Sequence, residues 1–417
     1  MNVNLQNNRT STVNKLNITL VPDYFFPMSL GAEIHVYNLA RKLKQRNIPV
    51  SILTRNVPQL NKTKDNLHVS GFPSLFGQYH WYMKGYYLPL FDPFLALIPI
   101  LKRSLFNKSI IHAHGPIGLS IAAHKKCSNF PLLLSVHDYW PICFQRSLLL
   151  SDESVCNLTT KCSTCLSMDI GQLSTISKLV SSANTVLIEN FDKFIAVSHF
   201  VKTMLVKGGI PGKKIEVIHN WINLQKLEPY LKNIPANREK TVLYVGQVSK
   251  LKGTHLAVEA MTQLTKEIPD LKFRVIGSGP LLSTLRKKVK KNGLFHSICF
   301  LGTVNKETLF NEYRKAKLFV CPSLWPDPCP TVVLEAMAFK LPVIASNIGG
   351  IPEMVNHGFN GFLFPAGDTA ALAESVSKLV TNDELCSRFG ENSYLAVKSF
   401  DINSQLSKLL SLYSEFA

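Results

Sequence analysis

Two carboxylates flank the predicted start of a helix in the stretch CPSLWPDPCPTVVLEAMA, residues 321–338. Asp327 lies on a proline-rich loop, and Glu335 follows about one turn inside a helix that Pro330 is suited to begin. A helix start presents backbone amides and a partial positive charge, which favour a diphosphate. The two carboxylates add hydrogen-bond acceptors for sugar hydroxyls. This spacing therefore predicts a site for a sugar that carries a diphosphate.

A lysine and a glycine precede another predicted helix in YVGQVSKLKG, residues 244–253. Lys252 can neutralise phosphate charge, and Gly253 permits close approach of the backbone. The stretch VIGSGP, residues 275–280, also ends a strand in glycines, but the chain has no complete Gly-x-Gly-x-x-Gly fingerprint with its acidic partner. A nicotinamide-dependent oxidoreductase is therefore disfavoured.

Histidines end two predicted strands in the first half of the chain. HAHG contains His112 and His114, and SVHD contains His137 and Asp138, so we expect three imidazoles and one carboxylate on one rim. A single histidine is usually structural. Two strand ends that both carry histidines favour a functional role for at least one of them as much as a purely structural role. Gly31 precedes a predicted helix, where backbone amides can approach a phosphate.

The elements that position these residues alternate between β-branched strands and helices. Strands are predicted in residues 15–22, 49–55, 109–114, 131–138, 193–198, 214–220, 241–246, 272–279, 298–302, 317–323 and 342–346, with second-half helices from about Thr254, Pro280, Asn305 and Pro330. This alternation favours parallel sheets with helices on both faces, and ligands bind such sheets beyond the carboxyl ends of the strands. We therefore predict an α/β fold of two doubly wound, Rossmann-like domains facing a cleft.

Changes in composition divide the 417 residues into segments. The polar, Asn-rich residues 1–15 are predicted to form a disordered tail. The first domain is predicted over 16–226, a linker over 227–240 and the second domain over 241–400. Residues 401–417 are expected to form a helix, and packing back on the N-terminal domain is one option for it.

The charge balance favours anionic partners. The chain has 46 Lys and Arg against 28 Asp and Glu, a net charge of +18. We interpret the basic run LRKKVKK, residues 285–291, as a solvated helix face, and without a nucleic-acid-binding motif we expect no nucleic-acid partner. We find no secretory signal and no membrane-spanning stretch, so we predict a cytoplasmic protein. The apolar segment 86–103 is more typical of a core helix, with an interfacial membrane contact as the alternative.

Four cysteines follow the second histidine motif. Cys143, Cys156, Cys162 and Cys165 have the spacing C-x12-C-x5-C-x2-C, which is compatible with a structural tetrathiolate zinc site. Unliganded thiols are the alternative, because only the last pair has zinc-type spacing. Cys321 and Cys329 are interpreted as packing residues.

From about Lys15 onward, the sequence resembles glycosyltransferase family 4 (group 1), whose members are retaining nucleotide-sugar transferases of the GT-B fold. The resemblance rests on GAEIHVYNLARKL, SVHDYW, IHNWIN, GQVSKLKG, the eight-residue spacing from Asp327 to Glu335, and GGIPEMV followed by GFNGFLFPAGD. Some family members have a similar cysteine-bearing insertion, which places one here over 143–165.

This resemblance implies a role for each matched residue. Glu335 would bind the nucleotide ribose, Asp327 the donor sugar and Lys252 the diphosphate. Gly31 would let its loop touch the diphosphate, and His137 would lie near the transferred sugar. Two departures exist: Gln247 replaces an arginine that normally helps to bind diphosphate, and Asp327 is one methylene shorter than the family's glutamate.

The chemistry follows from these assignments. His137, Lys252 and Asp327 are the expected catalytic residues, and Gly31, Gln247, Lys252, Asp327 and Glu335 the expected donor-binding residues; His112, His114 and Asp138 are assigned to the acceptor side. We expect no cofactor or metal in catalysis.

The expected activity is metal-independent transfer of a hexose from a UDP- or GDP-sugar to a glycan or lipid-linked acceptor in polysaccharide or glycan synthesis, with association at the cytoplasmic membrane face as an option. A GT-B nucleotide-sugar epimerase, which would turn over the donor without an acceptor, is one alternative. A non-catalytic glycan-assembly subunit is the other, because Gln247 and Asp327 depart from the family pattern.

Overall fold

A computed structural model describes residues 16–23, 25, 31–55, 67–72, 82–83, 86–87, 109–122, 125, 130–143, 145–150, 154–158, 185–232, 234–235 and 237–417. The chain divides into two compact units. The first comprises Met1–His219 and Leu406–Ala417, and the second Asn220–Gln405. The predicted tail, 1–15, and almost all of the apolar segment 86–103 lie outside the described residues.

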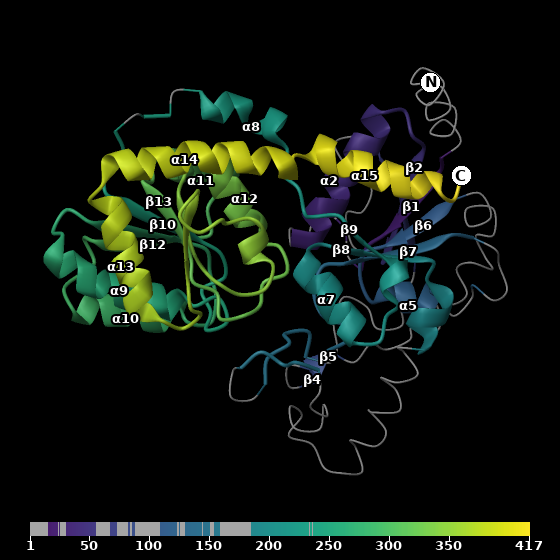
Figure 1. Ribbon diagram of the computed structural model, residues 1–417, viewed down its shortest axis with the longest axis horizontal. Coiled ribbons are helices and arrows are strands. Elements are labelled where there is room, and N and C mark those ends of the chain that lie inside the picture. Colours follow the sequence, from purple (N-terminus) through teal and green to yellow (C-terminus); the bar gives the residue numbers. More distant parts are fainter. Residues whose placement is uncertain are drawn as a thin grey trace, which may run out of the picture. The chain divides into compact units, whose positions relative to one another are not determined.

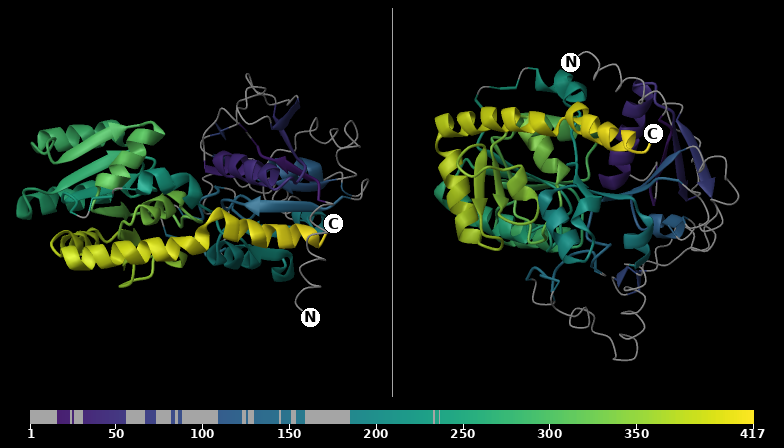
Figure 2. Two further views of the ribbon diagram at one scale, coloured as in Figure 1. Left: turned by 90° about the horizontal axis from the view of Figure 1, so that it is seen from above. Right: turned by 45° about the vertical axis from the view of Figure 1, so that its right-hand side comes forward.

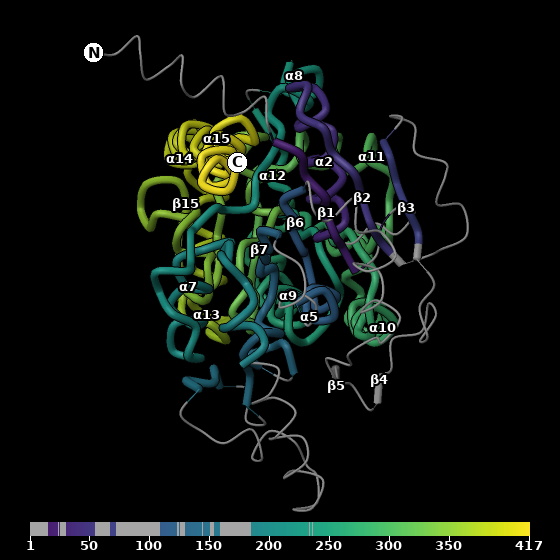
Figure 3. The backbone as a smooth tube through the Cα atoms, turned by 90° about the vertical axis from the view of Figure 1, so that its right-hand side faces the viewer, coloured from purple at the N-terminus to yellow at the C-terminus, as the bar shows by residue number. Residues whose placement is uncertain are grey.

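The first unit contains a seven-stranded parallel sheet in the order β3-β2-β1-β6-β7-β8-β9. Figure 3 shows β3, β2 and β1 followed by β6 and β7. The strands are β1 (Ile18–Val21), β2 (Val50–Arg55), β3 (His68–Phe72), β6 (Ile110–Ala113), β7 (Leu132–Val136), β8 (Lys193–Ala196) and β9 (Ile215–Val217). A separate antiparallel pair joins β4 (Tyr82–Met83) and β5 (Tyr86–Tyr87). The helices are α2 (Gly31–Gln45), α5 (Ile117–Ala122), α7 (His199–Lys207) and the short η3 (Gly212–Lys214).

The central strands are apolar because both faces of the sheet are covered. Every residue of β1, β6 and β7 is buried. Continuous burial is typical of parallel strands between two helical layers, and it explains why these strands appear in the sequence as unbroken apolar runs rather than as alternating ones. Three polar side chains within these runs, Thr19, His112 and Ser135, are buried as well.

The second unit contains a six-stranded parallel sheet in the order β12-β11-β10-β13-β14-β15. Its strands are β10 (Thr241–Val245), β11 (Lys272–Ile276), β12 (Ile298–Gly302), β13 (Leu318–Cys321), β14 (Val343–Ser346) and β15 (Gly361–Phe364). Its helices are α8 (Leu224–Leu231), α9 (Thr254–Glu267), α10 (Leu282–Lys291), α11 (Lys306–Lys315), α12 (Thr331–Ala338), α13 (Thr369–Val380), α14 (Asp383–Val397) and the short η4 (Ile351–Glu353) and η5 (Lys398–Phe400).

These helices cover both faces of the second sheet. Contacts place α9, α10 and α13 on one face, and α11 and α12 on the other with α8 and α14 packed against them (Figure 1). The basic run 285–291 falls on α10, where Leu285 and Val289 are buried. The predicted doubly wound α/β fold is confirmed for each unit.

Each sheet has a point at which the strand order reverses. In the first unit the chain moves outward from β1 to β2 and β3, and then returns to place β6 on the other side of β1. In the second unit β11 and β12 extend one way from β10, and β13 lies on its other side. Loops that follow neighbouring strands diverge at such a point, which is where doubly wound sheets bind ligands.

Three segments differ from the sequence expectations. Helix α8 covers Leu224–Leu231 and so takes in the start of the predicted linker, 227–240, while the two units divide after His219. Asn223 caps α8 by accepting a hydrogen bond from the Lys226 amide at 3.0 Å, a signal that the sequence interpretation overlooked. The edge strands β3 and β15 were also not predicted, because each includes a glycine and few β-branched residues.

The C-terminus forms α15 (Ile402–Ser414), directly after α14 and η5; α14 and α15 are among the yellow helices in Figure 2. Residues 406–417 belong to the first unit. There the hydroxyl of the buried Tyr413 lies 2.6 Å from Nδ1 of His112 on β6, so the last turn of the chain is tied to the central strands of that unit.

Candidate functional site

An ion pair joins the two loops at the reversal point of the second sheet. Lys252 follows β10 and Asp327 follows β13, and the Lys252 ammonium contacts the Asp327 carboxylate. The Asp327 side chain is only 8% exposed, whereas the Lys252 side chain is 27% exposed. The Lys252 ammonium also lies 4.4 Å from the ring centroid of Trp325, a cation–π contact that the sequence interpretation missed. A cation is therefore fixed, with one side open, at the ligand-binding edge.

Two glycines, one after β10 and one after β14, let their loops approach the loop after β13. Gly253 has a φ of +65°, and a Cβ at this position would lie 1.7 Å from the carbonyl oxygen of Pro322. Gly349 has a φ of +63°, and a Cβ there would lie 2.5 Å from the carbonyl oxygen of Asp327. The neighbouring Gly350 amide donates to that same oxygen at 2.8 Å. The predicted glycine at 253 is thus required by packing, and the loop after β14 holds the backbone of Asp327.

Glu335 lies in the second turn of α12, a helix that Pro330 caps rather than begins. The hydroxyl of Tyr313, from α11, donates a hydrogen bond to Oε2 of Glu335 at 3.0 Å. Burial raises the pKa of the Glu335 carboxyl above its usual value of 4.5, although this hydrogen bond acts in the opposite direction. The carboxylate is therefore held in one orientation in poorly solvated surroundings, and further hydrogen-bond donors would stabilise it. Sequence reasoning missed Tyr313, since an aromatic residue on a helix most often belongs to the core.

Gln247 is exposed on the loop after β10. Its backbone carbonyl accepts a hydrogen bond from the Tyr244 hydroxyl at 2.7 Å, so the loop is anchored through its main chain. Its side chain brings no charge to the edge where Lys252 and Asp327 meet. Cys321 and Cys329, predicted to be packing residues, are buried, and burial raises the pKa of the Cys321 thiol to about 12.

The predicted rim of imidazoles is present in the first unit. Nδ1 of His114 lies 3.1 Å from Nε2 of His137, across the ends of β6 and β7. His112 is buried deeper: its Nε2 lies 2.8 Å from the Ser135 hydroxyl, and its Nδ1 is taken by Tyr413. Burial lowers the pKa of His112 to about 3. These contacts give His112 a structural role and leave His114 and His137 as the rim.

A third imidazole joins this rim. His35, from the second turn of α2, has its ring centroid 4.8 Å from that of His137 and 5.8 Å from that of His114. The sequence analysis did not select His35, because it stands inside a helix and no motif identifies it. Its place in the rim depends on how α2 packs against the sheet.

The remaining predicted residues of the first unit have other neighbours. Asp138 forms an ion pair with Arg146 and caps its own loop by accepting from the Trp140 amide at 2.8 Å. Gly31 is the first residue of α2, and a Cβ added there would meet nothing within 4 Å. Asp138 is thus engaged with its own segment, and Gly31 is placed at a helix start as predicted.

Two of the four candidate zinc ligands belong to the described residues. The Cys143 sulfur lies 3.4 Å from the Leu148 amide, and the Cys156 sulfur lies 3.4 Å from the Leu158 amide. Neither of these two thiols forms a disulfide with another described cysteine. Cys162 and Cys165 lie outside the described residues, so the structural zinc site stays a prediction.

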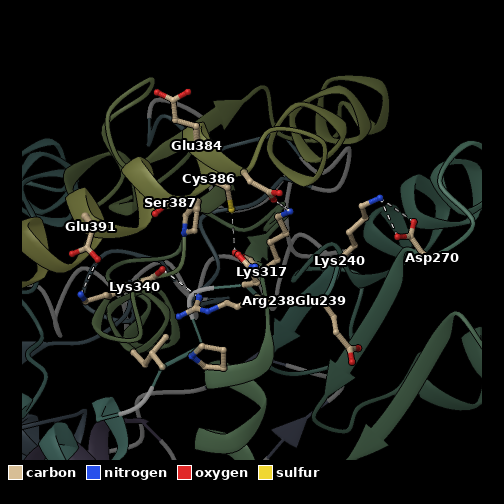
Figure 4. A pocket seen from close by; sticks show the side chains of 15 residues that line it. Arg238, Glu239, Lys240, Asp270, Lys317, Lys340, Glu384, Cys386, Ser387 and Glu391 are labelled. Atoms are coloured by element: carbon tan, nitrogen blue, oxygen red, sulfur yellow. Dashed lines mark hydrogen bonds and ion pairs between the residues drawn. The ribbon is translucent and has the colours of Figure 1, made fainter.

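A cavity of about 890 Å³ lies at the other edge of the second sheet, where β10, β13 and β14 begin. Figure 4 shows the charged side chains that line it. Lys240 pairs with Asp270 at 3.0 Å and Lys340 with Glu391 at 2.8 Å, so these charges are neutralised locally. Because the cavity lies at the edge where these strands begin, it is not part of the carboxyl-end site that contains Lys252 and Asp327.

Comparison with known families matches both units. The family described as "Glycosyltransferase Family 4" matches residues 30–226, and "Glycosyl transferases group 1" matches residues 231–396. An uncharacterized glycosyltransferase of Methanocaldococcus jannaschii is 27% identical over 408 residues, which cover 95% of this chain and 98% of that protein. N-acetyl-alpha-D-glucosaminyl L-malate synthase of Bacillus anthracis is 24% identical over 388 residues, which cover 91% of each chain. Phosphatidyl-myo-inositol mannosyltransferase of Mycobacterium leprae is 28% identical over 203 residues, 48% of this chain and 53% of that one.

Solved structures share the fold. HepE from Anabaena in complex with UDP superposes with a TM-score of 0.71 at 18% identity, covering 96% of this chain and all of that one. Sucrose-phosphate synthase from Thermosynechococcus elongatus superposes with a TM-score of 0.73 at 22% identity, covering 96% and 98% of the two chains. Among the described residues, no helix combines the length and apolar content needed to cross a bilayer.

Proposed function

Because the chain belongs to the group 1 glycosyltransferases of family 4, we propose that it transfers a hexose-type sugar from a nucleotide diphosphate sugar to a glycan or lipid-linked acceptor, with retention and without a catalytic metal. The observation that carries this proposal is the Lys252–Asp327 ion pair at the reversal point of the second sheet. It supplies one fixed cation and one fixed carboxylate at the edge where such sheets bind ligands.

In this proposal the second unit binds the donor. Glu335 accepts hydrogen bonds from the ribose, and its orientation by Tyr313 supports that role. Lys252 and the first amides of α9 and α12 bind the diphosphate, while Asp327 accepts from hydroxyls of the sugar. A UDP- or GDP-sugar is the proposed donor, and the UDP complex of the HepE structure supports a uridine nucleotide. Gln247 lies near the diphosphate without adding charge, and Gly31, the first residue of α2, is proposed to offer its backbone to the donor.

The chemistry needs charge stabilisation more than a side-chain nucleophile. The bond from the anomeric carbon to the diphosphate breaks, and the acceptor oxygen forms its bond on the same face. The leaving diphosphate takes the acceptor's proton, and Lys252 stabilises the charge that develops on it. A fixed ammonium supplies in this scheme the charge that a divalent ion supplies in other phosphate chemistry. The partial exposure of Lys252, together with its fixed orientation, supports this role.

The first unit provides the remaining groups. In this proposal His137 lies near the transferred sugar and His114 lies on the acceptor side, and the 3.1 Å contact between their nitrogens supports a shared location for the two rings. His112 and Asp138 support this region from behind through their contacts with Tyr413 and Arg146. The net charge of +18 supports an anionic or membrane-surface acceptor at the cytoplasmic face, in polysaccharide or glycan synthesis.

The test measures release of nucleoside diphosphate from a panel of UDP- and GDP-hexoses, with and without glycan and polyprenyl-phosphate acceptors, and the anomeric configuration of the product by NMR. Release that requires an acceptor and gives a retained linkage supports the proposal. Donor turnover without an acceptor and with a rearranged free sugar would indicate the epimerase, and donor binding without turnover would indicate the non-catalytic subunit. Asp327→Asn is expected to lower turnover at least about tenfold.

A further inference from the structure

Three histidine side chains from three elements of the first unit converge on one point. His35 comes from α2, His114 follows β6 and His137 follows β7. The ring centroids are 4.8 Å apart for His35 and His137, 5.5 Å for His114 and His137, and 5.8 Å for His35 and His114. Each ring offers one nitrogen, and the three nitrogens lie within 4.8 Å of one another.

One nitrogen in the group lacks a hydrogen bond. Nε2 of His114 has no partner among the described residues, although the residue is only 4% exposed. Buried polar atoms nearly always have a partner. Nδ1 is the nitrogen of this ring that faces His137, so Nε2 is the nitrogen of His114 that does not bind the ion. His112, whose ring centroid lies 4.1 Å from that of His114, cannot supply a ligand because both of its nitrogens are already engaged.

The spacing also agrees with a shared ligand. Nδ1 of His114 and Nε2 of His137 are 3.1 Å apart. Two nitrogens that bind one tetrahedral zinc ion at about 2.0–2.1 Å lie roughly 3.3 Å from each other. A small rotation of the rings would exchange the hydrogen bond between His114 and His137 for two bonds to one ion.

We propose that His35, His114 and His137 bind one divalent transition-metal ion, with Zn²⁺ as the best match and a fourth position left for water or an incoming ligand. Three imidazoles without a carboxylate select Zn²⁺ and its neighbours over Mg²⁺ or Ca²⁺, which prefer oxygen ligands. His137 is partly exposed, which gives the ion a path to the site.

The site has a consequence that rests on the role proposed above for His137. If the His137 imidazole lies beside the transferred sugar, an ion bound to its nitrogen fills the space that the sugar needs and takes the nitrogen that would face the sugar. Zinc then competes with the donor sugar and lowers turnover, so the site is inhibitory and is separate from any catalytic metal.

The experiment uses the full chain after treatment with a chelator and its removal. Zn²⁺ binding is measured by calorimetry, and the visible d–d absorption of bound Co²⁺ reports a nitrogen-ligated site. His35→Gln is expected to weaken binding at one site by at least about tenfold and to remove the d–d band. His296→Gln is the matched control, because this exposed histidine belongs to neither group of described side chains that could hold a metal ion.

Two further variants keep the result unambiguous. Cys165→Ser distinguishes metal bound by the cysteine-rich segment from metal bound by the three histidines. Co²⁺ bound to thiolates adds sulfur charge-transfer absorption, which a histidine site lacks. His137→Gln changes a partly exposed residue and should lose the same equivalent of metal, with the melting temperature in chelator confirming an intact fold.

If His35→Gln and His137→Gln both retain wild-type zinc stoichiometry and affinity, the site is overturned. A final arm titrates donor against zinc. If zinc binds but does not compete with the donor, the role proposed for His137 is contradicted, whereas the proposed metal site is still supported.

Discussion

The hydroxyl of Tyr313 and Oε2 of Glu335 are 3.0 Å apart, so a side chain of α11 fixes a carboxylate of α12. The carboxylate is partly desolvated, and burial raises the pKa of Glu335. A charged carboxylate in such surroundings lowers the stability of the protein alone, and hydrogen bonds donated by a ligand offset that loss. This relationship between Tyr313 and Glu335 links stability and ligand binding in a way that can be measured.

Glu335→Gln is expected to preserve or raise stability near pH 7. Between the usual pKa of 4.5 and the raised value, the folded chain holds a proton that the unfolded chain has released. The free energy of unfolding of the wild type therefore falls as the pH rises through this window. The variant escapes this loss, and its amide oxygen can still accept from Tyr313. Urea unfolding from pH 4 to 8 should show a difference that grows in favour of the variant and then levels off. A variant that is less stable at pH 7 would contradict this account.

Lys252→Met is expected to destabilise the protein by roughly 1–3 kcal/mol, because it leaves Asp327 with a largely buried charge and no cation. Asp327→Asn should cost less, since the Lys252 ammonium keeps partial access to water. The double variant should recover part of the stability lost in Lys252→Met. Chemical denaturation of the three variants completes the cycle, and strict additivity would show that the pair is not coupled.

Gly253→Ala is expected to cost at least about 2 kcal/mol, because it combines a left-handed backbone with a Cβ that meets the Pro322 carbonyl. Gly293→Ala is the matched control: its φ is +70°, and a Cβ there meets nothing within 4 Å. The control should lose only the conformational cost of about 1 kcal/mol. Equal melting temperatures for the two variants would show that close approach of the loops does not matter.

Tyr413→Phe should destabilise the chain by about 1–3 kcal/mol, since it leaves Nδ1 of His112 buried without its partner. Tyr394→Phe, at a partly exposed position in the second unit, should change stability by less than about 0.5 kcal/mol. The comparison is made by urea unfolding of both variants. If Tyr413→Phe leaves the free energy of unfolding unchanged, the hydrogen bond to His112 does not stabilise the packing of α15.

The placement of Lys252 and Asp327 at strand ends could be predicted from the alternation of strands and helices. Their pairing could not, because it depends on β13 returning to the side of β10, and strand order is not written in local periodicity. The helix starts near Thr254 and Asn305 were predicted correctly, since a glycine and a capping asparagine mark them.

Other parts of the site depend on tertiary packing. His35 and Tyr313 each lie within an amphipathic helix, where a histidine or an aromatic residue carries no sign of what it will face. Helix α8 was taken for a linker because its proline and the polar residues around it resemble a loop, although a capping Asn223 precedes it. Propensity and pattern thus locate elements, whereas contacts between elements complete the site.

The most direct test of the central claim is nucleotide binding by the second unit's site. Melting temperatures are measured for the full chain with UDP, GDP and ADP, for the wild type, Glu335→Gln, and the exposed control Glu384→Gln on α14. At 100 times its dissociation constant, a nucleotide that binds only the folded chain should stabilise it by about 2.7 kcal/mol. We predict that one nucleotide does so for the wild type and the control, and that Glu335→Gln weakens its affinity at least about tenfold. If no nucleotide at millimolar concentration stabilises the wild type, or if Glu335→Gln responds as the wild type does, the proposed donor site is wrong.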